Sequence, residues 1–373
     1  MPAYRVPLFE RLGSLPGVDL TVYAGGDEGS LRATSSDAKA YEFKGAPVRM
    51  LPLGLRLQSG AWEAMRQRPD LLIAPWDVRY MNIFPLIAMA RVCGVPVVLW
   101  GHGYSQRPHR LTDAARNACG RLADGVLLYT RTVAAKLVAA GELPRARVFV
   151  AQNALDQTPI QSARRRWTAD SQALREFQRE RGLDPARTLL FVSRLEPRNR
   201  VDLLLEAVAR LVGRFEGLRL VIVGEGSARA SLERRSEELG IRASVLFTGA
   251  LYDEDQLAPW MLSSAAFCYP TNIGLSLLHA FGYGLPAITS ANRSLQNPEI
   301  EALRTGHNGL EYRDGDVDDL VRQCTRLLAD PELRARLGQN ALETVLRDYS
   351  IENMLDGFRA VLEWAKTAKR GRA

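Results

Sequence analysis

The sequence contains no run of about twenty apolar residues and no pair of closely spaced cysteines. The first absence excludes a membrane-spanning helix, which needs that length to cross the hydrocarbon core. The scatter of Cys93, Cys119, Cys268 and Cys324 favours small buried side chains in a reducing compartment over a disulfide framework. No basic segment followed by an apolar run opens the chain, so we predict no signal peptide and a cytoplasmic location.

Acidic residues are scarce in the first part of the chain. Residues 1–150 hold 19 lysines and arginines against 12 acids, whereas residues 151–373 hold 30 of each. The net charge of +7 therefore belongs to the first part. A basic surface there suits peripheral contact with an anionic membrane or a lipid pyrophosphate, and an ordinary solvated surface explains it equally well. No dense basic run or zinc motif accompanies it, so nucleic acid is not an expected partner.

Strand and helix patterns alternate along the 373 residues, which are enough for two domains with separate cores. The alternation is clearest in the second half, where short apolar runs end in polar or glycine-containing loops. These runs are residues 188–192, 218–223, 245–248 and 265–269. Short connections between alternating strands and helices predict an α/β fold with parallel sheets covered on both faces.

The segment from Tyr269 to Ser290 is the most informative part of the sequence. A buried strand ends at Pro270, a loop with Gly274 follows, and residues 276–283 have the apolar spacing of a helix. Free backbone N–H groups and the positive end of the helix dipole then face into the loop, which predicts an anion-binding cradle. Many α/β domains contain such a cradle, so by itself it does not identify an activity.

The motifs around this cradle resemble the donor-binding half of the retaining GT-B enzymes of glycosyltransferase family 4. They are Gly274-Leu275, the helix end Ala280-x-x-x-Gly284-x-Pro286, Pro298-Glu299-Ile300 and Asn308-Gly309-Leu310. The resemblance extends over most of the chain. It implies two doubly wound, Rossmann-like domains that face a cleft, a nucleotide-sugar donor as substrate, and neither a metal nor a cofactor.

The resemblance also implies how the leaving diphosphate is held. Arg194 stands at a strand end, where the family has an arginine, and its planar guanidinium can bind phosphate in a bidentate manner. The family usually has a lysine a few residues later, and that position is Asn199 here. Of the flanking arginines we favour Arg200 as the substitute. A structural alternative for Arg194 is a strand cap paired with Glu196.

Two further segments match the nucleotide-binding part of the family. Gly224 and Gly226 follow a strand, as the family's Gly-x-Gly does near the nucleotide. The next strand ends in Thr248-Gly249 and offers no acid for a ribose, which counts against a dehydrogenase. Leu251 lies in the loop that the family uses to contact the base through backbone groups.

This sequence departs from the family at both carboxylates of its Glu-x₇-Glu signature. Thr271 stands at the first position, which faces the donor sugar, and His279 at the second, which faces the ribose. His279 can still hydrogen-bond a ribose hydroxyl, or it can be a buried helix residue. The other groups expected at the donor are the side chain of Asn272, the backbone amides of Ile273, Gly274 and Leu275, and the acid Glu299.

His102 is the expected contribution of the first half. It stands between two glycines at the end of the predicted strand 95–100, where ligands of open α/β sheets bind and where a histidine can exchange a proton near neutral pH. The family has a His-Gly pair here that faces the donor sugar and the acceptor. The alternative is a capping or packing role.

The beginning of the chain departs from the family in another way. The segment Tyr4-Arg5-Val6-Pro7-Leu8-Phe9 belongs to a predicted helix, and the strand that precedes it in the family is missing. That strand is usually central, so its loss should leave a gap in the sheet. We hypothesise a start codon further upstream or a shortened form. The next strand is predicted at 18–23, followed by a loop and a short strand near 48–51.

These features predict four segments. Residues 1–155 form the acceptor-side domain, 156–186 a linker with a surface helix, 187–348 the donor-binding domain, and 349–373 a helix that crosses back to the first domain.

The expected activity is a hexosyl or deoxyhexosyl transfer, with retention, from a nucleotide sugar to a hydroxyl of a glycan or lipid-linked acceptor in surface polysaccharide assembly. Two alternatives remain open. One is a non-catalytic protein that binds a sugar nucleotide or a partner transferase, and the other is a GT-B-like sugar-nucleotide epimerase.

Overall fold

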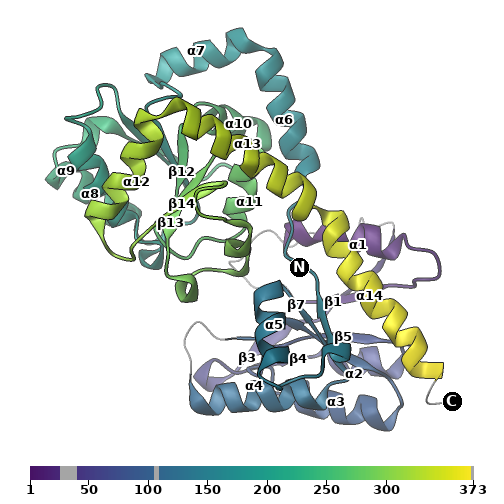
Figure 1. Ribbon diagram of the computed structural model, residues 1–373. Coiled ribbons are helices and arrows are strands. Elements are labelled where there is room, and N and C mark those ends of the chain that lie inside the picture. Colours follow the sequence, from purple (N-terminus) through teal and green to yellow (C-terminus); the bar gives the residue numbers. More distant parts are fainter. Residues whose placement is uncertain (26–39, 105–108, 371–373) are drawn as a thin grey trace. The chain divides into compact units, whose positions relative to one another are not determined.

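The computed structural model describes residues 1–25, 40–104 and 109–370. Its contacts divide the chain into two compact units (Figure 1). Unit 1 comprises residues 1–153 together with 351–373, and unit 2 comprises residues 154–350. The last helix therefore belongs with the first part of the chain. In the described residues no helix has both the length and the apolar character needed to cross a membrane.

Unit 1 contains a four-stranded parallel sheet whose strands lie in sequence order. The strands are β5 (Leu72–Pro75), β6 (Val97–Gly101), β7 (Gly125–Leu128) and β8 (Val148–Val150). The connecting helices are α3 (Ile83–Val92), α4 (Arg110–Leu122) and α5 (Arg131–Ala139). Residues Leu99, Val126 and Leu128 of the sheet are completely buried. This repeated crossover follows from the sequence, because parallel strands need a helix-length connection.

The segment before β5 has more structure than the sequence predicted. It contains α1 (Val6–Gly13), β1 (Thr21–Ala24), β2 (Glu42–Gly45), β3 (Val48–Met50), β4 (Arg56–Gln58) and α2 (Gly60–Arg66). β1 pairs with β2 in parallel, and β3 pairs with β4 as an antiparallel hairpin. The short strand predicted near 48–51 is confirmed as β3, whereas the loop expected around it was wrong, because it also contains β2 and β4. Residues 26–39 lie outside the described part.

The β1–β2 pair is not hydrogen-bonded to the four-stranded sheet in the described residues. This interruption agrees with the gap predicted from the missing first strand. A short 3₁₀ turn, η1 (Ala3–Arg5), leads into α1 and brings Arg5 beside Trp100 at the end of β6. Arg5 is buried there, with 7% of its surface exposed.

Helix α14 (Ile351–Arg370) completes the core of unit 1, where it packs along α1 and against β8 (Figure 1). Phe358 is 1% exposed, and its ring centroid lies 5.0 Å from that of Trp100. Gly357 approaches the backbone of Val150 and Ala151 so closely that a Cβ atom would collide with the Val150 carbonyl oxygen. The helix is therefore fitted to this surface and is not a free tail.

Unit 2 contains a six-stranded sheet in the order β11-β10-β9-β12-β13-β14, with every pair parallel. The strands are β9 (Thr188–Val192), β10 (Arg219–Val223), β11 (Val245–Gly249), β12 (Ala266–Cys268), β13 (Ala287–Ser290) and β14 (Gly309–Tyr312). The strand order reverses between β9 and β12. In open α/β sheets ligands bind outside the carboxyl ends of the strands at such a reversal.

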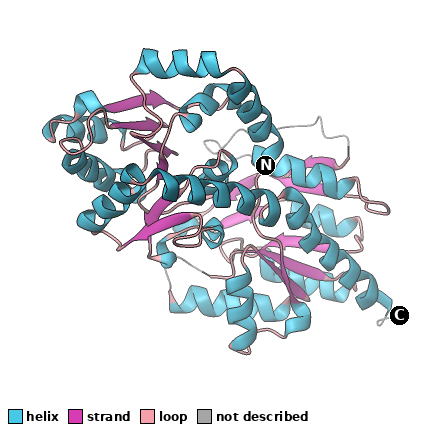
Figure 2. Ribbon diagram, turned by 45° about the horizontal axis from the view of Figure 1, so that its top comes forward, coloured by secondary structure: helices cyan, strands magenta, loops and turns pink. Residues whose placement is uncertain are grey.

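Helices flank this sheet (Figure 2). They are α8 (Val201–Leu211), α9 (Arg229–Glu238), α10 (Glu254–Leu262), α11 (Leu275–Gly282), α12 (Val317–Ala329) and α13 (Pro331–Asp348). α8 shows how the pattern works: Leu204, Ala207 and Val208 are completely buried, as their helical spacing predicts.

Residues 157–181 form two helices where the sequence analysis predicted a linker with one surface helix. They are α6 (Gln157–Ala169) and α7 (Ser171–Arg181), which share Asp170 as cap. α6 packs on α10 and α11 and buries Ile160 and Ala163, each 1% exposed. α6 is therefore an integral part of unit 2. The sequence signal was weak because α6 carries three consecutive arginines at 164–166 on its remaining surface.

The packing of α14 generates a stability prediction. Replacing Phe358 by Ala should lower the free energy of unfolding of unit 1 by about 3–5 kcal/mol, because a large buried ring leaves a cavity. Arg359→Ala is the matched control, since Arg359 is exposed and paired with Asp356. Its effect should stay within about 0.5 kcal/mol. Urea unfolding followed by tryptophan fluorescence measures the free energy of unfolding of both variants. A loss below about 1 kcal/mol for F358A would contradict the packing described.

Candidate functional site

Four loops meet at the carboxyl edge of the unit 2 sheet, on either side of the point where the strand order reverses. They follow β9, β10, β12 and β13 and comprise residues 193–200, 224–228, 269–274 and 291–297. All the strands are parallel, so these loops lie at the same edge. Most of the residues predicted to bind the donor stand in them.

The loops after β9 and β10 are tied together through their backbones. Leu195 N donates to the Glu225 carbonyl oxygen at 2.9 Å, and Ala228 N donates to the Leu195 carbonyl oxygen at 2.8 Å. At Gly224 and Gly226 a Cβ atom would collide with the backbone of residues 193 and 195. Both glycines are therefore needed for the close approach of the loops, which is the role visible in this structure.

The loop after β12 is fixed by a network of amide side chains. Asn272 is in the left-handed conformation with a φ of 64°. Its Nδ2 donates to Asn199 Oδ1 at 2.9 Å, and its backbone carbonyl accepts from Asn297 Nδ2 at 2.9 Å. Asn199 Nδ2 in turn donates to the Arg194 carbonyl oxygen at 2.7 Å. Neutral amides therefore connect the loops at the position where the family has a lysine.

The backbone amides at the start of α11 differ in their availability. Ile273 N, which was predicted to face the donor, donates to Gln296 Oε1 at 2.8 Å and so already has an acceptor within the protein. The amides of Gly274 and Leu275 donate to no acceptor in the described residues, and no side chain caps the helix. These two N–H groups, at the positive end of the helix dipole, can receive an anion.

Arg194 and Arg200, the two arginines predicted to bind the diphosphate, differ in whether they form an ion pair. The Arg194 side chain is exposed and makes no ion pair or hydrogen bond with the described residues. Arg200 is also exposed but pairs with Asp202, with 3.2 Å between its Nη2 and Oδ2. Its φ of 51° places it at the left-handed turn between η4 (Pro197–Asn199) and α8. Arg194 is thus an available cation at this edge within the described residues, whereas Arg200 must leave a carboxylate to serve a ligand.

Thr271 and Glu299, which were predicted to contact the donor, are both buried. Thr271 is 6% exposed, and its Oγ1 is buried without a hydrogen-bond partner. Glu299 is 4% exposed within the 3₁₀ helix η7 (Pro298–Ala302). Beside them, Tyr269 donates to Ser193 Oγ at 3.0 Å, and burial raises the pKa of Tyr269 to about 12. This hydroxyl therefore stays protonated and acts as a structural donor.

His279 faces a carboxylate that the sequence analysis did not single out. Its Nε2 lies 2.8 Å from Glu254 Oε1, and the Tyr283 hydroxyl donates to the same oxygen at 2.5 Å. Burial by itself would raise the pKa of Glu254, but the hydrogen bonds from His279 and Tyr283 hold that pKa below its usual range. A carboxylate is thus present beside residue 279. The feature of the sequence that could have indicated this carboxylate is the position of Glu254, directly after Asp253, the N-cap of α10.

Leu251 follows β11 and packs against the core of unit 2. It lines a cavity of about 540 Å³ together with Thr248 and the aromatic side chains Trp167, Phe177 and Trp260. Its side chain has a packing role.

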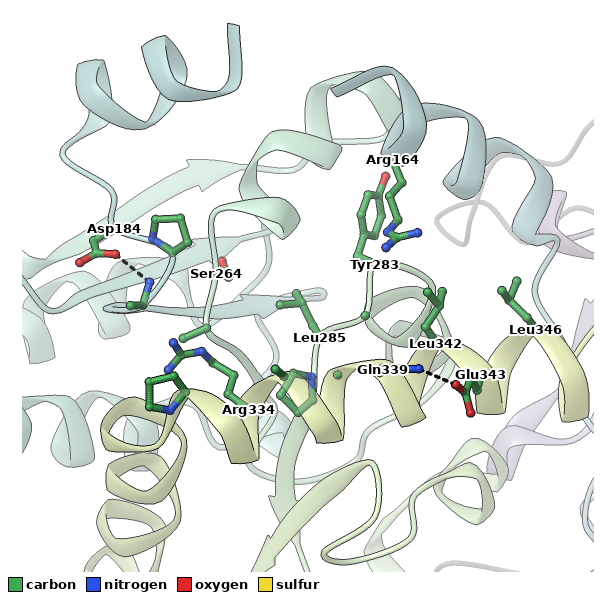
Figure 3. Close-up of a pocket in the computed structure, with 18 residues that line it drawn as sticks. Arg164, Asp184, Ser264, Tyr283, Leu285, Arg334, Gln339, Leu342, Glu343 and Leu346 are labelled. Carbon is green, nitrogen blue, oxygen red and sulfur yellow. Dashed lines mark hydrogen bonds between the residues drawn. The ribbon is translucent and has the colours of Figure 1, made fainter. Parts of the chain in front are cut away.

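A larger cavity, of about 890 Å³, lies at the opposite edge of the same sheet (Figure 3). It is lined by Asp184, Ala265 and Pro286, which stand just before β9, β12 and β13, and by Arg334 of α13. None of the predicted site residues lines it. Its place at the amino ends of the strands separates it from the candidate site.

His102 lies in unit 1, directly after β6. The residue is exposed, and its ring centroid lies 5.0 Å from that of Tyr129. The protein atoms packed around the ring, and then the Arg5 cation, lower the pKa of His102, while Asp77 acts in the opposite direction. A neutral imidazole can accept a proton or a hydrogen bond from a ligand hydroxyl. The sequence analysis did not single out Arg5 as a partner of this histidine.

The described residues contain no group of three or more His, Cys, Asp or Glu arranged to hold a metal ion. Acids near the candidate site have other partners: Asp253 caps α10, Asp255 pairs with Arg166, and Asp314 accepts from Ser290.

The fold is that of the GT-B glycosyltransferases. The structure of Anabaena Alr3699/HepE in complex with UDP superimposes with a TM-score of 0.68 over 86% of each chain, at 15% identity. The apo form of the lipopolysaccharide outer core galactosyltransferase WaaB gives a TM-score of 0.63 over 87% of this chain and 85% of that one, at 19% identity. Likeness at such low identity establishes the architecture only.

Sequence comparison establishes the family. Residues 175–344 match the family described as glycosyl transferases group 1. The chain is 32% identical to the alpha-D-kanosaminyltransferase of Streptomyces kanamyceticus over 281 residues, which cover 70% of this chain and 69% of that protein. The chain therefore belongs to the glycosyl transferases group 1 family and is a glycosyltransferase.

A second relative aligns with a shorter part of the chain. The lipopolysaccharide core biosynthesis glycosyltransferase LpsE of Rhizobium meliloti is 27% identical over 180 residues, which cover 48% of this chain and 50% of that protein. The chain thus spans about half the length of that relative.

The Glu254 cluster generates a pH-dependent stability prediction. The pKa of Glu254 is lowered in the folded protein, so its contribution is complete above the ordinary value of 4.5 and is lost as the pH falls through the lowered value. At pH 7, Glu254→Gln should cost about 1–3 kcal/mol of unfolding free energy, because a charge-assisted acceptor is removed.

Urea unfolding of E254Q and the parent protein at pH 7 and at pH 3.5 measures this difference. It should shrink at the lower pH, which lies below the ordinary pKa of 4.5, because the unfolded parent then gains a proton on Glu254 and the advantage of the ionised side chain in the folded state falls. Glu237→Gln, on the exposed face of α9, is the control and should change little at either pH. A constant difference at both pH values would show that the ionised form of Glu254 adds nothing.

Proposed function

We propose that this glycosyltransferase moves a sugar from a nucleotide-sugar donor to a hydroxyl of a glycan or lipid-linked acceptor, with retention of anomeric configuration. The donor site rests on two amides, of Gly274 and Leu275, that have no acceptor among the described residues and lie at the reversal point of the unit 2 sheet. Arg194, at the end of the adjacent strand, likewise has no ion pair in that part of the chain. Together they offer a dipole end and a cation to a diphosphate.

This arrangement suits the chemical step. When the bond between the sugar and the diphosphate breaks, negative charge grows on the phosphate oxygens. Fixed N–H donors and a guanidinium stabilise that charge without having to reorganise. Stabilisation of the leaving group lets the acceptor hydroxyl attack on the face that the diphosphate leaves, as proposed for the retaining enzymes of family 4. The neutral imidazole of His102 is the proposed contribution of unit 1.

The proposed donor contains a uridine diphosphate or a related nucleotide. HepE was crystallised with UDP, with UDP and glucose, and with UDP-glucose, and it shares this fold. The matched relatives include enzymes named for lipopolysaccharide core biosynthesis and for kanosamine transfer. Assembly of surface polysaccharide is therefore the proposed setting, at the cytoplasmic face of the membrane, where the basic charge of residues 1–150 suits anionic lipid.

A second candidate is a protein that binds a sugar nucleotide without transferring the sugar. Specific observations favour it: Thr271 and Asn199 replace a carboxylate and a lysine of the family, and the neutral Asn199–Asn272 pair joins their loops. The Glu254–His279 pair favours a functional nucleotide site, because it keeps a carboxylate beside the position that the family uses for the ribose. Turnover of the donor distinguishes the two candidates.

The role of Arg194 can be tested by substitution. Arg194→Met should lower kcat/KM for a UDP-sugar donor about 100- to 1000-fold, as expected when one group that stabilises developing charge is removed. Arg234→Met is the control, because Arg234 is an exposed arginine on α9 in the same unit. The assay measures release of UDP and formation of glycosylated acceptor over a panel of acceptors.

Three outcomes are informative. Donor-dependent product from the parent protein, lost in R194M and kept in R234M, supports the proposal. Binding of UDP with no hydrolysis or transfer supports the non-catalytic alternative. Conversion of the donor sugar without any acceptor supports an epimerase and contradicts the proposed transfer.

A further inference from the structure

We propose that unit 1 has its own phosphate-binding site, in which the Arg5 guanidinium holds a phosphate group beside His102 at the end of β6. The ligand class rests on the proposed function, since nucleotide sugars and lipid-linked acceptors both carry phosphate. The existence of the site does not require turnover.

The first observation is a buried cation without a counter-charge. Arg5 is 7% exposed and forms no ion pair with any carboxylate in the described residues. Its single hydrogen bond there goes from Nη1 to the sulfur of Met354, at 3.6 Å. Arginine stays ionised in proteins, and an ionised group removed from water is costly unless an anion compensates it. A bound phosphate would supply that anion.

The second observation is that aromatic rings hold the guanidinium in place. Its central carbon lies 4.5 Å from the ring centroid of Trp100, 5.0 Å from that of Tyr4 and 5.3 Å from that of Tyr129. Cation–π contacts offset part of the desolvation cost, yet they leave most of the N–H groups without acceptors. The aromatic packing therefore fixes the orientation of the guanidinium and keeps its hydrogen-bonding capacity free.

Two other arginines of unit 1 show that the lack of a carboxylate partner is not general there. Arg11, which lies in α1 six residues after Arg5, pairs with Glu352 of α14 at an exposed position. In the same unit, Arg79 forms a bidentate pair with Asp77, in which Nε donates to Oδ1 and Nη2 donates to Oδ2. Buried Arg5 thus lacks the carboxylate partner that the exposed Arg11 and Arg79 have, which is the reverse of what stability alone would select.

The third observation is access from solvent. His102 and Arg5 both pack against Tyr129, with 5.0 Å between the rings of His102 and Tyr129. His102 is exposed, so a ligand that reaches its imidazole comes beside the buried guanidinium. The site stands at the carboxyl end of a parallel sheet, where such folds bind ligands. A neutral histidine and an arginine fork together match a phosphate, which accepts hydrogen bonds on several oxygens.

Histidine NMR on the full chain tests the site directly. The chain has four histidines, and His102→Gln identifies the resonance of His102 in protein with ¹³C-labelled histidine. Titration with inorganic phosphate and with pyrophosphate should shift this resonance in a saturable manner. In Arg5→Met the apparent Kd should rise about tenfold or more, the effect of losing one charge-assisted interaction. Arg66→Met, at an exposed arginine of α2, should leave the Kd within about twofold.

Arg5→Lys covers the case in which the Met variant does not fold. It keeps the charge and loses the planar fork, so it should weaken binding severalfold while thermal unfolding stays cooperative. No saturable shift of His102 in the parent protein, or the same Kd in the parent and the folded Arg5 variants, would overturn the proposal.

Two sources of phosphate are distinguished by further titrations. If the phosphate belongs to the nucleotide, UDP shifts the His102 resonance more strongly than glycerol 1-phosphate does. If it belongs to a phosphorylated acceptor, glycerol 1-phosphate is at least as effective, and its effect survives Arg194→Met. A protein that binds phosphate at His102 but transfers no sugar would contradict the proposed function and support this site. A protein that transfers sugar but binds no phosphate at His102 would support the proposed function and contradict this site.

Discussion

The structure of the candidate donor site depends on the position at which the strand order of the unit 2 sheet reverses. The strand order reverses between β9 and β12, and the loops that follow these two strands meet close to the start of α11, where Asn272 donates to Asn199. Gly224 and Gly226 allow the loop after β10 to approach the one after β9. The free amides of Gly274 and Leu275 follow from this backbone arrangement more than from any particular side chain.

The chain reaches this geometry with an unusual distribution of charge. Asn199, Asn272 and Asn297 join the loops through neutral amide contacts, while Arg194 keeps its cation free. The carboxylate Glu254 lies on α10, beside His279. In unit 1, Arg5 is a buried cation that pairs with no acid among the described residues. Positive charge is thus unpaired at the strand ends of both units, which is consistent with substrates that carry phosphate.

The sequence predicted the architecture well because it depends on periodic patterns. The alternating strands and helices of unit 2, the cradle before α11 and the burial of α8 all follow from apolar spacing and from glycines at loop positions. The gap in the sheet of unit 1 was also predicted, from a missing strand. α6 was overlooked because three arginines at 164–166 hide the small apolar stripe of Ile160 and Ala163.

The side-chain partners in the site were less predictable, since they depend on contacts between distant segments. Nothing in the local sequence indicates that Gln296 occupies the Ile273 amide, that His279 faces Glu254, or that Arg5 lies beside His102. Thr271 and Glu299 were expected at the donor from alignment alone, and burial places both in the interior of unit 2. Alignment identifies a position in the chain, but the direction of its side chain is set by packing.

The most direct measurement is backbone hydrogen exchange of the segment 270–278, with and without UDP. The account predicts that the Gly274 and Leu275 amides exchange readily in the free protein and become protected when UDP binds, because the diphosphate takes them as donors. Unchanged exchange at both amides under saturating UDP would contradict the proposed binding of the diphosphate at the start of α11.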